Sequence, residues 1–115
     1  MPVTATGASA TPLHHSFVRN LILRTSSEGY ASLCNAIATA EKPNYAAITV
    51  PLLIIAGSDD ETAPMAGCQS ILDSYSTEQQ NKKIVVLSGV GHWHCIEAGE
   101  LVAENIKTFV EDRSF

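Results

Sequence analysis

The run VPLLIIA, Val50 to Ala56, restricts the fold of this chain more than any other feature of its sequence. Apolar and polar residues do not alternate along it, so a strand formed here is apolar on both faces. Strands of this kind are covered on both sides, which is typical of the parallel sheets of α/β proteins. A second apolar run, KIVVL at 83–87, follows after a stretch with helical spacing. We therefore expect two parallel strands joined by a right-handed crossover that contains a helix.

Helices are predicted on either side of these strands. The small and polar residues 1–14 indicate a flexible lead-in, and apolar residues at 17–23 indicate a short helix. A second helix is expected to begin at Ser26, and helices are also expected at 66–75 and 101–110. The predicted fold class is α/β, in the order helix, helix, strand, helix, strand, helix. The apolar face of the second helix has the spacing i, i+3, i+4, i+7, formed by Tyr30, Leu33, Cys34 and Ile37.

Length and composition exclude several classes of protein. The 115 residues permit one domain, and their net charge of −5 includes no basic run, which argues against nucleic acid and anionic membranes as partners. The longest apolar run is too short to span a bilayer, and the N-terminal residues do not have the pattern of a secretory signal. The three cysteines are widely spaced, which favours a reducing compartment and predicts a cytoplasmic protein. Two apolar strands with open edges also predict self-association.

Chemically active side chains follow both predicted strands. In a parallel sheet, the loops that leave the C-terminal ends of the strands share one edge, where ligands bind. The first of these loops carries Asp59 and Asp60, and the second carries His92 and His94. Adjacent strands lie only about 4.8 Å apart, so a carboxylate from one loop can reach an imidazole from the next. A general base requires such a pair, because the acid fixes the tautomer of the ring and stabilises the imidazolium.

The same two loops resemble segments of a known family. The stretch VPLLIIAGSDDETAP resembles the segment of α/β-hydrolases that bears the acid of the catalytic triad, a strand followed by G-x-x-D-x-x-x-P. The stretch VVLSGVGHWHCIEAGELVAENIKTFV resembles the segment that bears the triad histidine, G-x-G-H-x-x-x-x-E, with the closing helix. Residues 15–45 look like the end of the cap domain, as in hydrolases similar to 3-oxoadipate enol-lactonases, and residues 46–115 look like the closing βαβα unit. The matching motif residues are Gly57, Asp60 and Pro64 in the first segment and Gly89, Gly91, His92 and Glu97 in the second.

The resemblance implies a serine hydrolase that acts on a small-molecule ester or lactone, with neither a metal nor an organic cofactor. It implies that Asp60 is the orienting acid and His92 the general base. The nucleophile of this family lies earlier in the chain, on a G-x-S-x-G turn, and the family's oxyanion hole also lies upstream. This sequence has no such turn, and its nearest string is GASAT around Ser9. The resemblance therefore implies the C-terminal part of a hydrolase, a truncated form with little activity alone.

Some residues beside the pair have alternative roles. Asp59 competes with Asp60 as the acid, although the motif spacing favours Asp60 and an aspartate such as Asp59 suits a turn. His92, His94 and Cys95 are all zinc-ligand types, but three ligands within four residues of one turn are sterically awkward, so no metal site is expected. Cys95 is instead expected to pack as a small apolar residue.

Three further residues have one functional and one structural interpretation. Trp93 fits either a wall of the substrate pocket or a buried anchor. Arg24, in the cap-like region, is a candidate to bind a substrate carboxylate through bidentate hydrogen bonds, and its alternative is a solvated helix cation. Glu97 is expected to stabilise the first turn of the final helix, where negative charge is favourable.

A second function fits the same sequence. A non-catalytic α/β module would bind a partner through the open edge of its sheet. Its apolar strands would have the same role as in the hydrolase, whereas His92 would be idle. The two functions therefore differ in whether Asp60 and His92 are needed.

Overall fold

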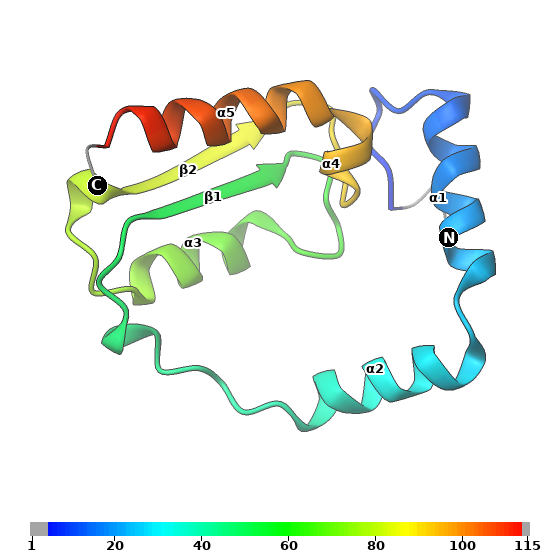
Figure 1. Ribbon diagram of the computed structural model, residues 1–115, viewed down its shortest axis with the longest axis horizontal. Helices are drawn as coiled ribbons and strands as arrows, with labels where there is room; N and C mark the ends of the chain where they lie inside the picture. Colours follow the sequence, from blue (N-terminus) through cyan, green and yellow to red (C-terminus); the bar gives the residue numbers. More distant parts are fainter. Residues whose placement is uncertain (1–4, 114–115) are drawn as a thin grey trace.

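A computed structural model describes residues 5–113 of the 115-residue chain (Figure 1). Two strands pair in parallel, in a register that runs from Leu52 opposite Lys82 to Gly57 opposite Leu87. The mixed α/β class and the parallel strand–helix–strand unit predicted from the sequence are confirmed. The main elements are α1 (Pro12–Arg24), α2 (Ser27–Thr39), β1 (Leu52–Gly57), α3 (Met65–Ser74), β2 (Lys82–Leu87), α4 (His94–Glu97) and α5 (Gly99–Glu111), with short 3-10 turns at Tyr45–Ala47 and Gln79–Asn81.

Helices flank the strand pair on two sides, as the lack of alternation in the apolar runs predicts. α3 lies along one side of the pair and α5 along the other (Figure 1). Leu72 is the buried residue of α3, and the carbonyl oxygens of Leu72 and Tyr75 accept hydrogen bonds from Lys82 Nζ, which ties the end of that helix to β2. The core between α5 and the strands consists of Leu87, Val90 and Val102, with Ile55, Val85 and Ala98 packed against them.

Side-chain caps set the starts of the first two helices. α1 begins at Pro12, earlier than its apolar pattern predicts, because Thr11 Oγ1 accepts a hydrogen bond from His14 N and Thr11 N donates to His14 Nδ1. Proline is favourable at this first position because it has no N–H, and an N–H there would have no partner within the helix. α2 begins after Ser26 as predicted, and the Ser26 hydroxyl accepts from Gly29 N.

Residues 5–10 are attached to the rest of the fold. From residue 5 onward the structure therefore differs from the flexible lead-in expected over residues 1–14. The reason is that the backbone of this stretch is hydrogen-bonded to the loop after β2. Ser9 N donates to Gly89 O at 2.9 Å, and Ala5 O accepts from His92 N at 2.9 Å. Residues 1–4 lie outside the described part of the chain.

The molecule exposes more surface than a compact domain of its size. Its accessible surface is 7976 Å², whereas a folded monomer of 12.3 kDa exposes about 6,100 Å². Its radius of gyration is 16.0 Å, against about 13 Å for a compact chain of this length. The first two helices contribute to this excess, because Val18 is the only buried residue on either of them. Within residues 5–113, no helix is both long and apolar enough to cross a bilayer.

Candidate acid–base site

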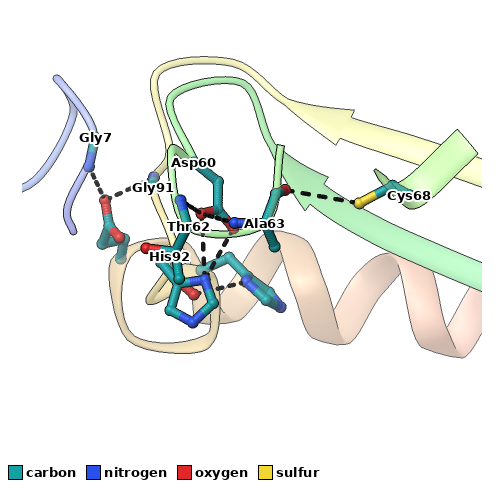
Figure 2. A network of polar contacts seen from close by, with 9 residues as sticks. Gly7, Asp60, Thr62, Ala63, Cys68, Gly91 and His92 are labelled. Atoms are coloured by element: carbon teal, nitrogen blue, oxygen red, sulfur yellow. Dashed lines mark hydrogen bonds and ion pairs between the residues drawn. The ribbon is translucent and has the colours of Figure 1, made fainter. Parts of the chain in front are cut away.

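The loops that follow β1 and β2 bring a carboxylate and an imidazole together (Figure 2). Asp60 lies just beyond β1, where its N–H donates to Gly57 O at 3.3 Å. His92 lies in the loop beyond β2. Asp60 Oδ2 and His92 Nδ1 are 3.0 Å apart, which is a hydrogen-bond distance. The structure therefore contains the contact that the sequence predicts across the sheet edge.

The Asp60 carboxylate is held through both of its oxygens. Oδ1 accepts from the N–H groups of Thr62 and Ala63, each at 2.9 Å. Both oxygens lie within hydrogen-bond distance of His92 Nδ1, Oδ2 at 3.0 Å and Oδ1 at 3.2 Å. The side chain is only 6 % exposed. Burial favours the neutral acid, but the Ala63 N–H, the His92 ring and the Thr62 N–H together outweigh it, so the pKa of Asp60 lies below its usual range. Asp60 is thus an ionised acid with a fixed orientation.

His92 has its second ring nitrogen available for chemistry. The side chain is 42 % exposed, and the hydrogen bonds of its ring within residues 5–113 are made by Nδ1. Because the carboxylate accepts at Nδ1, the neutral ring carries its hydrogen there and has a lone pair at Nε2. A ring in this tautomer can remove a proton from a hydroxyl placed at Nε2, and Asp60 stabilises the imidazolium that forms.

The residues after His92 shape its loop. Trp93 is half-buried, and its ring stands edge-on to that of His92, with ring centroids 6.5 Å apart and an interplanar angle of 85°. His94 begins α4, and its Nδ1 lies 3.1 Å from His92 O. Cys95 is exposed, so the packed position expected for it is wrong: the single turn of α4 directs it away from the core. No group of three metal-binding side chains is found in the described part of the chain.

Ser9, in the N-terminal segment, and Ser58, in the loop after β1, both use their hydroxyl groups in local hydrogen bonds. Ser9 Oγ donates to Gly89 O at 2.7 Å. Ser58 Oγ donates to Asp59 Oδ1 at 2.8 Å and accepts from Gly89 N at 2.8 Å. Neither hydroxyl is directed at His92 Nε2, as a nucleophile would be.

The structure gives the two neighbouring aspartates different partners. Asp59 Oδ2 accepts from Ala8 N at 2.8 Å, and this hydrogen bond, followed by that from the Ser58 hydroxyl, lowers the pKa of Asp59. Asp59 therefore holds the N-terminal segment, whereas Asp60 faces the imidazole. Arg24 is not brought to the pair, because it ends α1 and that helix leads away from α4 (Figure 1).

Two parts of this site were not predicted from the sequence, residues 5–9 and the position of Glu97. Glu97 ends α4 and does not lie in the first turn of α5, because the chain forms an extra helical turn before that helix. Its Oε1 accepts from Gly7 N at 2.7 Å and from Gly91 N at 3.1 Å (Figure 2). One feature of the sequence could have indicated the attachment of residues 5–9. Thr11-Pro12 is a helix start, and the backbone groups of the residues before a helix need hydrogen-bond partners elsewhere.

Comparison with models of known families finds no match to this chain, and no curated protein matches it. The grounds for a function are therefore the motifs and the geometry of the site. An oriented, buried carboxylate faces an exposed imidazole at the edge of a parallel strand pair.

Proposed function

We propose that this chain supplies the acid–base half of a serine-type hydrolase that acts on carboxylic esters or lactones. The observation that carries the proposal is the 3.0 Å contact between Asp60 Oδ2 and His92 Nδ1. The pair lies where ligands of open α/β sheets bind, and acid precedes histidine as in the α/β-hydrolase order. We further propose that the strands and helices belong to the C-terminal part of that fold, with α1 and α2 from its cap.

In the proposed reaction, His92 Nε2 removes the proton of a serine hydroxyl while the serine oxygen attacks the carbonyl carbon of the ester. Asp60 keeps a proton on Nδ1 and stabilises the imidazolium. The imidazolium then gives the Nε2 proton to the departing alkoxide, which leaves as an alcohol, and an acyl-enzyme remains. Water, activated by the same nitrogen, attacks the acyl group and releases the acid.

The serine and the oxyanion hole are proposed to come from a longer form of this polypeptide or from a partner chain. Two observations support this proposal. The hydroxyl groups of Ser9 and Ser58 are engaged within the loops, and the chain exposes about 1,900 Å² more surface than a compact monomer of its mass. A standard protein–protein interface buries about 800 Å² of each partner, so this excess is large enough to receive another folded part.

The test is an ester and lactone hydrolysis assay on the 115-residue chain and on a form extended upstream by its own coding sequence. We expect negligible turnover by the short chain. In a form with the serine, Asp60→Asn should lower kcat by about 10⁴-fold and His92→Ala by at least as much. The matched controls are His94→Ala and Asp59→Asn, in which the asparagine keeps an oxygen that can accept from Ala8 N; each should change kcat by less than about ten-fold. Turnover that survives His92→Ala would exclude the proposal. Robust turnover by the short chain that needs His92 would show that the nucleophile lies within it.

A second candidate function is a docking module without catalysis. It is favoured by the open sheet: among residues 5–113 each strand has one hydrogen-bonded neighbour, so β1 and β2 both have an outer edge without a partner strand. Native mass spectrometry separates the two functions. A stoichiometric complex with another protein, together with no esterase activity in any form and no effect of Asp60→Asn, would favour the docking module.

A further inference from the structure

A segment far from His92 in the sequence is bound to its loop. We call residues 5–9 the N-terminal strap. Its backbone makes hydrogen bonds to both catalytic loops, since Ser9 N donates to Gly89 O at 2.9 Å and Ala8 N donates to Asp59 Oδ2 at 2.8 Å. The backbone of His92 itself takes part, because His92 N donates to Ala5 O at 2.9 Å. The position of His92 is therefore set partly by the strap.

Glu97 joins the strap to the residue that precedes His92. Its Oε1 accepts from Gly7 N at 2.7 Å and from Gly91 N at 3.1 Å. Glu97 is 9 % exposed, and its Oε2 is buried with no hydrogen-bond partner in the described part of the chain. A buried carboxylate is unfavourable unless it is hydrogen-bonded. Its two hydrogen bonds are therefore the interactions that compensate for burying Glu97 here.

The packing between strap and loop leaves no room for adjustment. A Cβ atom added at Gly7 would overlap Gly89 O and would lie 2.6 Å from Gly91 N. A side chain at position 7 would therefore force the strap and the His92 loop apart. By contrast, a Cβ added at Gly67, within α3, meets nothing within 4 Å. The two glycines form a matched pair for an experiment.

We propose that Glu97 is a positioning residue for His92, and that it acts by clamping the N-terminal strap onto Gly91. Glu97 does not touch the imidazole; it fixes the backbone on which the imidazole is carried. The inference rests on the proposed function in one respect: the position of His92 matters for catalysis only if His92 is the general base. The clamp itself is a property of the fold and is tested without any substrate.

The experiment is NMR on the ¹⁵N-labelled 115-residue chain, with the ring nitrogens of His92 and the amides of Gly7 and Gly91 as readouts. In Glu97→Ala we expect the two glycine amides to exchange roughly ten-fold faster and the His92 Nδ1–H signal to broaden or move. Gly7→Ala should have the same effect on His92, whereas Gly67→Ala should leave His92 unchanged. Glu97→Gln, which retains an oxygen acceptor, should restore the His92 signals.

Two outcomes would overturn the proposal. The first is a His92 ring signal in Glu97→Ala identical to that of the wild type while the strap amides exchange freely. The second is a Gly7→Ala variant that has lost strap protection without any change at His92. Gly7→Ala acts at the contact between the strap and the loop and leaves the Glu97 side chain in place, so it decides the question even if Glu97→Ala fails to fold. Asp60→Asn separates this inference from the proposed function, since it should alter the His92 ring while the strap amides stay protected.

Discussion

Two regions of this molecule differ in how their residues are held. The loops after β1 and β2, with the strap at residues 5–9, are linked by backbone and carboxylate hydrogen bonds and enclose the Asp60–His92 pair. The helical arm, residues 12–39, consists of α1 and α2 and buries Val18 alone. Hydrogen bonds within this chain therefore hold Asp60 against His92, whereas the arm leaves most of its apolar side chains exposed.

The largest contrast should appear in the free energy of unfolding when an apolar side chain is shortened to alanine in the core or in the arm. Leu87 lies in the buried cluster beside α5, so Leu87→Ala should lower the free energy of unfolding by about 2–5 kcal/mol. Ile37, on α2, is 70 % exposed. Ile37→Ala should therefore change the free energy of unfolding by less than about 0.5 kcal/mol. Urea denaturation measures both. A cost at Ile37 comparable to that at Leu87 would show that the arm is packed in solution.

Self-association should depend on the arm as well as on the open edges of the sheet. Leu33 and Ile37 share the exposed apolar face of α2, and large apolar surfaces of this kind mark association sites. The double variant Leu33→Glu, Ile37→Glu should weaken association by about ten-fold or more and leave the circular dichroism spectrum unchanged. Sedimentation at several concentrations measures the effect. A wild-type chain that is monomeric throughout would contradict the predicted self-association.

Acid should lower the stability of the fold through Asp60, in the loop after β1. Because the pKa of Asp60 is lowered on folding, the unfolded chain binds more protons than the folded chain at acidic pH. The stabilisation is complete above the pKa of an unfolded aspartate, roughly 3.9, and is lost as the pH falls through the lower value of the folded state. Asp60→Asn should therefore flatten the acid limb of a stability–pH profile. Parallel acid limbs in the two proteins would contradict the lowered pKa.

The smallest global effect is expected at the start of α2. Ser26 Oγ accepts from Gly29 N at 3.0 Å, and loss of such a cap destabilises a helix by about 1 kcal/mol. Since α2 makes no buried contact, we expect Ser26→Ala to speed amide exchange within α2 and to leave the urea midpoint unchanged. A shifted midpoint would show that α2 unfolds together with the core.

The parts predicted well from the sequence are those governed by local pattern. The run from Val50 to Ala56 predicts a strand, which the structure has at Leu52–Gly57 with its first four residues half-buried. Ser26 predicts a helix start, which is also present. The spacing of the acid motif also selects Asp60 over Asp59, in agreement with the contact to His92.

What the sequence did not predict depends on contacts between distant segments. The strap meets the His92 loop across more than eighty residues of chain, and the role of Glu97 appears only when Gly7 and Gly91 lie side by side. Neither a periodicity nor a motif in the sequence predicts such a contact between distant segments. Cys95 was misplaced because the sequence pattern does not predict the extra helical turn, α4, on which it is exposed.

The central claim is that Asp60, and not its neighbour, orients the imidazole of His92. The most direct test is the ¹⁵N spectrum of the His92 ring, at a pH where the ring is neutral, in the wild type, Asp60→Asn and Asp59→Asn. We expect a proton on Nδ1 and a lone pair on Nε2 in the wild type and in Asp59→Asn, with that preference lost in Asp60→Asn. A wild-type ring protonated on Nε2, or an Asp60→Asn spectrum equal to that of the wild type, would contradict it.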